Sequence, residues 1–329
     1  MAEGHPAVAE MEFEVWHTFD GKARAAEVRL PCRTVGFLTG IPWEQFTLPL
    51  MQGKRTLISL CNIGPVCSRD AITMIHDAQV HLSPASYGRG FRLWYRFVQP
   101  ILGCRNRRLL TVSAYSRAQI AAAGICPTDR IDVVHNGVDH ILRVANDPSA
   151  VLVLGLTSGR YVVALSTTQA HKNIAILLKA YSDPMLADLP LVLVGGTGRE
   201  AFEAAGIEVP ANVRFAGRVS DEALRGLMEN ALCLAFPSKT EGFGLPPLEA
   251  MALGCPALLA PCGALPEIGG GAVVYVPPDD AEAWASVIHD LAHSPAKRAV
   301  LATLGKEHAR KFTWRNAALT LVDTLNRTC

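Results

Sequence analysis

The second half of the chain alternates short apolar runs with amphipathic segments. Continuous apolar runs predict strands at 160–166, 189–196, 212–217, 232–238, 256–260 and 272–276. Capped segments with helical spacing predict helices at 173–183, 220–231, 246–254 and 279–294. Strands that are apolar throughout and alternate with helices are typical of a parallel sheet covered on both faces. Glycines at strand ends favour a Rossmann-like domain with its site at the carboxyl edge of the sheet.

The first half has a weaker α/β pattern. It predicts strands at 34–38, 56–60, 72–76 and 109–114, helices at 91–102 and 116–124, and a strand within 130–139 that runs into an Asn136-Gly137 turn. The stretch 143–159 is interpreted as a linker between two sheets. We therefore expect an α/β protein of two Rossmann-like domains with a ligand cleft between them.

Composition narrows the function. The 329 residues are 50% hydrophobic and 19% charged, and 31 Lys and Arg face 30 Asp and Glu, a net charge of +1. That balance argues against a nucleic-acid partner. We see no signal peptide and no apolar run of the ~18 residues that a membrane span needs, so a soluble, cytoplasmic protein is expected. The nine cysteines form no CxxC pair and are interpreted as small core residues in a reducing compartment.

The stretch 238–256, SKTEGFGLPPLEAMALGCP, predicts an anion site. Pro246 and Pro247 suit the first turn of a helix and Gly254 suits its C′ position, which predicts a helix over 246–253. A turn with little side-chain bulk, at 242–244, precedes that helix. The backbone N–H groups and the positive dipole end of the helix are then available to an anion.

Glu241 and Glu249 stand on either side of this helix start. A carboxylate beside a phosphate site needs another ligand, and vicinal sugar hydroxyls suit it because one carboxylate accepts from both. Two carboxylates around an anion site therefore indicate two sugars around a diphosphate, the layout of a nucleotide-sugar. For a single Glu, a solvated surface helix would be the better interpretation.

The string EGFGLPPLE resembles the E-x7-E signature of the retaining glycosyltransferases of family 4 (glycosyl transferases group 1), whose fold is GT-B. The resemblance extends from about Leu38 to Trp314, through motifs that include MIHD (74–77), LLTVSAYSR (109–117), VHNGVD (134–139), HKN (171–173) and FAGRVSDEALRGLMENA (215–231). WEQFTLP (43–49) and CNIGPV (61–66) are similar to a bacterial polysaccharide subgroup in which mannosyltransferases are common. The resemblance implies two Rossmann-like domains that face each other across a cleft.

The resemblance also implies roles for individual residues. Three residues would be catalytic. His76 would contact the sugar, and Lys172 would neutralise the leaving diphosphate. Glu241 would bind hydroxyls of the transferred sugar. Gly242, Phe243, Gly244 and Leu245 would offer backbone N–H groups to the donor. Glu249 would hold the ribose. The nucleobase would lie beside Gly217, Arg218 and Val219. Taken singly, Lys172 and His76 are better explained as a solvated lysine and a hydrogen-bonded histidine at a strand end; His135 and His140 are interpreted as structural.

The implied reaction needs no cofactor, and its donor is a nucleotide-sugar, with GDP-mannose the best guess. No Asp-x-Asp motif with metal context occurs, so we expect metal-independent, retaining transfer without a metal site. The acceptor would be a glycan or a polyprenyl-linked oligosaccharide of polysaccharide or O-antigen synthesis, which leaves a peripheral contact with the inner face of the membrane open.

Residues 1–33 lack the first strand and Gly-rich loop usual in the family. We therefore expect a shortened N-terminal acceptor-side domain over 1–144, a donor domain over 145–311 and a tail helix over 312–329. The alternative function is a catalytically impaired donor-binding or partner subunit; a sugar-nucleotide epimerase fits the motifs less well. The basic aromatic stretch 87–97 is either a membrane-surface helix or, by preference, a helix that buries Phe91, Trp94 and Tyr95.

Overall fold

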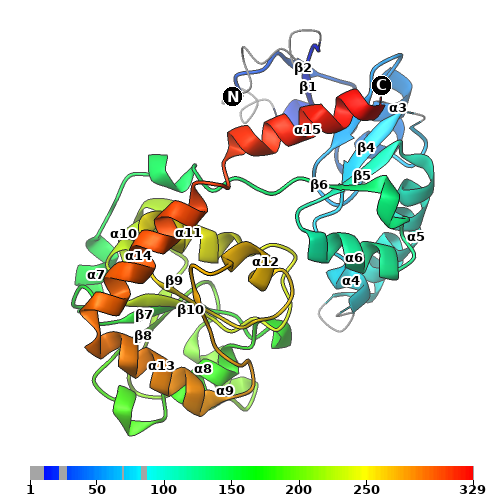
Figure 1. The fold of residues 1–329 in the computed structure, drawn as a ribbon. Helices are drawn as coiled ribbons and strands as arrows, with labels where there is room; N and C mark the ends of the chain where they lie inside the picture. Colours follow the sequence, from blue (N-terminus) through cyan, green and yellow to red (C-terminus); the bar gives the residue numbers. More distant parts are fainter. Residues whose placement is uncertain (1–10, 22–27, 69, 83–86, 329) are drawn as a thin grey trace. The chain divides into compact units, whose positions relative to one another are not determined.

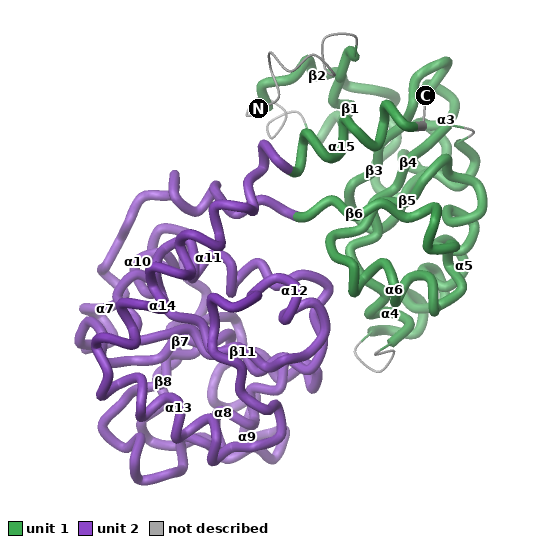
Figure 2. The backbone as a smooth tube through the Cα atoms, in the orientation of Figure 1, with its two compact units in different colours: residues 1–135, 317–329 green, residues 136–316 purple. Residues whose placement is uncertain are grey.

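The computed structural model describes residues 11–21, 28–68, 70–82 and 87–328. The chain divides into two compact units, residues 1–135 with 317–329 and residues 136–316 (Figure 2). The division falls between His135 and Asn136, and the C-terminal helix returns to the first unit. Within the described ranges, no helix is long and apolar enough to cross a membrane.

The first unit is a small α/β unit. Its strands are β1 (Val15–His17), β2 (Cys32–Thr34), β3 (Leu57–Ser59), β4 (Ala71–Met74), β5 (Arg108–Thr111) and β6 (Ile131–Val133). Its α-helices are α2 (Gly40–Pro42), α3 (Leu48–Met51), α4 (Gln79–Leu82), α5 (Arg89–Arg105), α6 (Ala114–Ala122) and most of α15 (Trp314–Thr328). A π-helical turn, η3, covers Trp43–Thr47, and short 3-10 turns cover Phe19–Gly21 and Thr128–Arg130.

Strands β3 to β6 pair in sequence order into a parallel four-stranded sheet. Its core includes Val98 and Leu102 of α5, Leu109 of β5 and Ile120 of α6, all fully buried. Apolar side chains on both sheet and helices drive this packing, as the sequence predicted. Strands β1 and β2 pair with each other, parallel, in a separate two-stranded sheet of the described residues.

The second unit is a larger doubly wound α/β unit (Figure 1). Its strands are β7 (Val162–Leu165), β8 (Leu191–Val194), β9 (Val213–Gly217), β10 (Cys233–Phe236), β11 (Ala257–Leu259) and β12 (Val274–Tyr275). Its α-helices are α7 (Ser149–Val153), α8 (Ile174–Ala180), α9 (Arg199–Ala204), α10 (Asp221–Glu229), α11 (Leu245–Leu253), α12 (Leu265–Gly269), α13 (Ala281–His293) and α14 (Pro295–Ala309). Three 3-10 turns, η6 (Ile141–Arg143), η7 (Ala170–Lys172) and η8 (Pro184–Leu186), complete it.

The strand order of the second sheet is β12-β11-β10-β7-β8-β9, and every pairing is parallel. Helices lie on both sides of the sheet, with α8, α9 and α13 on one side and α10 and α11 on the other (Figure 1). Trp284 of α13 and Leu177 of α8 are fully buried in the core between helices and sheet. The predicted Rossmann-like pattern of this half is confirmed, since each apolar run predicted as a strand contains one.

The stretch 143–159, predicted as a linker between two sheets, does lie along the chain between β6 and β7, but it is folded as part of the second unit. Part of the stretch forms α7, which packs against α10 inside the second unit. Val151 of α7 is buried, and the N–H of Asp147 donates to the carbonyl of Glu222 at 3.1 Å. The sequence signal failed because one buried valine in a short helix produces no periodicity.

The predicted turn at Asn136-Gly137 is also wrong, because residues 134–138 form no turn and the turn comes later, at Asp139 and His140. Gly137 is required for close approach instead. A Cβ atom there would lie 2.1 Å from the backbone nitrogen of Trp314. Beside it, the N–H of Val138 donates to the carbonyl of Phe312 at 3.0 Å. The two segments that connect the units therefore lie side by side at residues 137–138 and 312–314.

Three further predictions are corrected by side-chain burial and backbone geometry. The strand predicted at 34–38 ends at Thr34, and Gly36 has a φ of +68°. In α5 the buried face carries Val98 and Leu102; Phe91 is exposed, whereas Trp94 and Tyr95 are half-buried, with Trp94 packed against the core. Of the cysteines, the three at 126, 233 and 255 are buried, but those at 32, 61, 67 and 104 are exposed; Cys329 lies outside the described residues.

Gly137→Ala should destabilise the protein by about 1–3 kcal/mol, because overpacking forces the two connecting segments apart. Gly271→Ala is the matched control, since a Cβ there meets nothing within 4 Å and its φ is not positive. Urea unfolding of both variants measures the difference. Equal stability of the two variants would contradict the close approach.

Candidate active site

The carboxyl edge of the six-stranded sheet gathers the predicted donor-binding residues. Lys172 follows β7, the segment 217–219 closes β9, and Glu241 follows β10. Because all strands are parallel, their carboxyl ends lie at one edge, where ligands of doubly wound sheets bind. The fold therefore places these three positions, far apart in sequence, on the same side of one sheet.

Lys172 is held at this edge by the residue that follows it. Asn173 adopts a left-handed conformation with a φ of 58°, which separates η7 from α8. Its side-chain amide donates to the carbonyls of Pro237, at 3.1 Å, and Pro278, at 2.8 Å. Asn173 thus ties together the loops that follow three different elements, and Lys172 is fixed at their junction.

Lys172 and Glu241 form an ion pair. The Lys172 Nζ lies 2.7 Å from Oε1 of Glu241, and the two side chains are 23% and 12% exposed. The ammonium also lies over the ring of Phe236, 5.8 Å from its centre. Two predicted catalytic residues 69 positions apart in the sequence therefore meet in a partly desolvated site, where the attraction is stronger than at an exposed surface.

The backbone of Glu241 is fixed by the loop after β11. Its carbonyl accepts from the N–H of Ala264 at 3.0 Å. Gly263 has a φ of +62°, and a Cβ atom there would lie 2.5 Å from the nitrogen of Glu241. Only glycine permits both the conformation and the contact. The position of the Glu241 carboxylate thus depends on a residue of the neighbouring strand-to-helix loop.

Helix α11 begins directly behind this pair. Gly244 is its N-cap residue and no side chain caps it, while Pro246 and Pro247 lie in its first turn, as predicted. The three residues 242–244 are buried and Leu245 is half-buried. Phe243 packs edge-on against Phe312, with ring centres 6.1 Å apart. The helix therefore starts on a buried turn that packs against Phe312.

Glu249 lies in the middle of α11 and contacts a histidine. Its Oε1 is 3.2 Å from Nε2 of His140, and its side chain is 16% exposed. Burial raises the pKa of the Glu249 carboxyl above its ordinary value. His140 opposes that shift and Asp221 adds to it, but burial has the largest effect.

His76 belongs to the first unit and follows β4 at the carboxyl edge of that sheet. Its backbone N–H donates to the side-chain oxygen of Asn62 at 2.7 Å, and its Nε2 lies 2.8 Å from the carbonyl of Leu60. Asn62 has a φ of 64°. The histidine is therefore held by the loop that follows β3.

The predicted nucleobase segment runs from the end of β9 towards α10. Gly217, Arg218 and Val219 are half-buried, exposed and half-buried. A Cβ atom on Gly196, after β8, would lie 2.8 Å from Nε of Arg218, so the guanidinium crosses the end of the neighbouring strand. This segment lies at the sheet edge beyond β8.

Three residues that position the site were not predicted. Asn173 was noted only as part of the HKN motif, Gly263 was not considered, and His140 was interpreted as structural. Asn in a left-handed position and Gly beside a functional loop do leave a sequence signal, since these residue types suit a positive φ. The contact between His140 and Glu249 spans 109 positions and leaves none.

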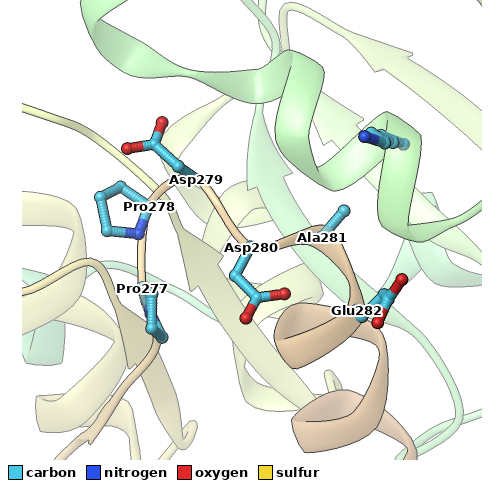
Figure 3. Close-up of a pocket in the computed structure, with 7 residues that line it drawn as sticks. Pro277, Pro278, Asp279, Asp280, Ala281 and Glu282 are labelled. Carbon is cyan, nitrogen blue, oxygen red and sulfur yellow. The ribbon is translucent and has the colours of Figure 1, made fainter.

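A hollow of about 520 Å³ lies elsewhere in the second unit, at the start of α13 (Figure 3). Its lining consists of Lys179 and residues 277–282, none of them a predicted site residue. Asp280 caps α13 by accepting from the N–H of Ala283, and Asp279 pairs with Lys239. Across the part of the chain that is described, no three His, Cys, Asp or Glu side chains are grouped so as to hold a metal ion.

Two α/β units, each built on a parallel sheet, have the architecture of the GT-B fold. Anabaena HepE, solved with UDP and glucose, shares this fold with a TM-score of 0.72 and 19% identity, over 95% of this chain and 91% of that one. The sequence model for glycosyl transferases group 1 matches residues 155–308.

Relatives with similar sequences are also named as glycosyltransferases. The chain is 30% identical over 257 residues to O-antigen chain mannosyltransferase B of Escherichia coli, across 75% of this chain and 67% of that protein. It is 27% identical over 256 residues to O-antigen chain mannosyltransferase RfbU of Salmonella typhimurium, across 73% and 68%. The chain belongs to the family of glycosyl transferases group 1.

A double-mutant cycle of Lys172→Met and Glu241→Gln should give a coupling energy of about 1–3 kcal/mol in unfolding, because each single change leaves the other group half-buried and unpaired. The pair Lys239 and Asp279 is the control, with side chains 45% and 77% exposed. Its cycle should give about 0.2–1 kcal/mol. Equal coupling in the two pairs would show that desolvation does not strengthen the Lys172 pair.

Proposed function

We propose that this chain transfers a hexose from a nucleotide-sugar to a growing glycan or a lipid-linked oligosaccharide of polysaccharide synthesis, with retention of configuration. The observation that carries the proposal is the partly buried ion pair of Lys172 and Glu241 at the carboxyl edge of the second sheet. A positive charge, a sugar-binding carboxylate and a nearby helix start form the set that a nucleotide-sugar needs.

Lys172 would stabilise the leaving diphosphate. As the glycosidic bond to phosphate breaks, positive charge grows on the sugar and negative charge on the diphosphate. Lys172 and the N-terminal turn of α11 supply protein charge and dipole against that negative charge. Glu241 holds the ammonium of Lys172 in place and accepts hydrogen bonds from hydroxyls of the transferred sugar. Because this set provides the charge, we propose that transfer needs no metal.

The two glutamates have different tasks. Glu241 would bind the transferred sugar, and Glu249 would hold the nucleotide ribose by accepting from its vicinal hydroxyls. His76 would contact the sugar. We propose front-face attack of the acceptor with a diphosphate oxygen as base, so that Glu241 is a binding residue and not a nucleophile.

The donor is proposed to be GDP-mannose. The names of the two relatives, both O-antigen chain mannosyltransferases, support this choice and an acceptor in O-antigen synthesis. A lipid-linked acceptor would bring the protein to the inner face of the membrane. Helix α5 supports that contact, since Phe91, Leu93 and Phe97 are exposed on it beside Arg89 and Arg96.

A second candidate is a donor-binding subunit with impaired transfer. It is favoured by one observation: in the described residues β1 and β2 pair with each other and not with the sheet that begins at β3. Titration of GDP and UDP, beside a transfer assay, separates the candidates. Binding with turnover supports the transferase, binding without turnover supports the subunit, and no binding of either nucleotide overturns both.

Glu241→Gln and Lys172→Met should each lower kcat of transfer about 100-fold or more, because each removes charge that acts on the transition state. Lys239→Met should leave kcat unchanged, since this exposed lysine pairs with Asp279. Steady-state kinetics with GDP-mannose measure the effect, and thermal unfolding confirms that the variants fold. Full activity of Lys172→Met would contradict the proposed charge role.

The affinity for GDP should fall on acidification, and the fall should begin at a higher pH than for a site with an ordinary glutamate. Burial raises the pKa of Glu249, and only its ionised form accepts hydrogen bonds from two hydroxyls. His140 and Asp221 are the charged neighbours that act on it. Below that pKa the affinity should level off about tenfold lower, because protonation removes only the contribution of the ribose contact.

The ligand phosphate titrates as well, so the measurement compares calorimetric titrations of the natural chain with those of Glu249→Gln. The variant should lose the part of the acid dependence that belongs to Glu249. Parallel pH profiles for both proteins would contradict the role of Glu249.

A further inference from the structure

A backbone clamp holds the segment around His140 against the start of α15. The N–H of Trp314 donates to Oδ1 of Asp139 at 2.7 Å, and the N–H of Val138 donates to the carbonyl of Phe312 at 3.0 Å. Gly137 permits the close contact of the two backbones. The position of His140 is therefore set by the two segments through which the chain passes between its units (Figure 2).

The His140 ring links Trp314 to Glu249. The indole Nε1 of Trp314 donates to Nδ1 of His140 at 3.1 Å, and the opposite ring nitrogen, Nε2, lies 3.2 Å from Oε1 of Glu249. An indole N–H can only donate, so Nδ1 must carry a lone pair. The proton of a neutral ring is then on Nε2 and points at the carboxylate. A single tautomer satisfies both contacts.

The ring thereby orients the carboxylate. One hydrogen bond to Oε1 occupies part of its accepting capacity and limits rotation of the side chain, while a carboxylate has about four acceptor positions in all. The remaining positions are enough to accept hydrogen bonds from two vicinal hydroxyls. His140 has a second effect. It counteracts the rise that burial causes in the pKa of Glu249, and so favours the ionised carboxylate.

We propose that His140 is a positioning residue for nucleotide recognition: held by Trp314 in its Nε2–H tautomer, it orients Glu249 to accept the two ribose hydroxyls of the donor. This inference rests on the proposed function, in which Glu249 holds the ribose. It adds a residue that does not touch the donor and that couples the connecting segments of the chain to donor affinity.

The test compares GDP with its 2′,3′-dideoxy analogue, which lacks both hydroxyls, by calorimetric titration at neutral pH. In the natural chain GDP should bind about tenfold or more tightly than the analogue, the effect of a hydrogen bond to a charged group. His140→Ala should remove most of that preference, because it should lower the affinity for GDP and leave the affinity for the analogue unchanged. His293→Ala is the matched control, because His293 lies on α13 and contacts the carbonyl of His289.

Two milder variants separate positioning from stability. His140→Gln keeps an N–H near the place of Nε2 and should retain most of the preference for GDP. Trp314→Phe removes the indole donor but keeps an aromatic ring, and it should lower the preference through GDP alone. In a double-mutant cycle, His140→Ala should change the preference little once Glu249→Gln is present, because both act on one contact.

The outcomes distinguish this inference from the proposed function. If Glu249→Gln abolishes the preference for GDP but His140→Ala leaves it intact, the positioning role of His140 is overturned and the ribose role of Glu249 stands. If Glu249→Gln keeps the preference, both are overturned. If His140→Ala weakens GDP and the analogue equally, His140 acts on the fold or on the phosphates and the inference fails.

Discussion

Parallel strand pairing is the constraint on which the rest of this protein depends. Every pairing between named strands is parallel, so each strand must be followed by a crossover before the next begins. All carboxyl ends then lie at one edge of each sheet, and the loops that leave them can come close enough to share a ligand. For this reason the same edge of the second sheet carries Lys172, Glu241 and the segment 217–219. His76 follows a strand at the carboxyl edge of the first sheet.

Loop positions at this edge are set by a few polar and glycine contacts. Asn173 binds two loop carbonyls, and Gly263 lets the loop after β11 lie against Glu241. These contacts hold charged groups where solvent is partly excluded, so that Lys172 and Glu241 attract each other more strongly than surface ions do. A charged site of this kind is stable only while both partners stay in place, because an isolated partner would remain desolvated.

Much of the fold could be predicted because its signals are local. The apolar runs and capped helices of the second half, the start of α11 at two prolines and its end at Gly254 were all predicted from neighbouring residues. The failures share a different cause. Part of segment 143–159 forms α7, in which one valine is buried, and Gly137 permits contact with a backbone 177 positions away rather than a turn. Neither requirement is expressed in the surrounding sequence.

The sequence by itself determined the residue types of the site and the helix start between the two glutamates, because capping, proline geometry and spacing act over a few residues. Only the tertiary structure decided which side chains meet. It paired Lys172 with Glu241 and, through Trp314 and His140, connected Glu249 to the segments that join the units. Contacts over such separations follow from sheet order and close packing, which no local pattern encodes.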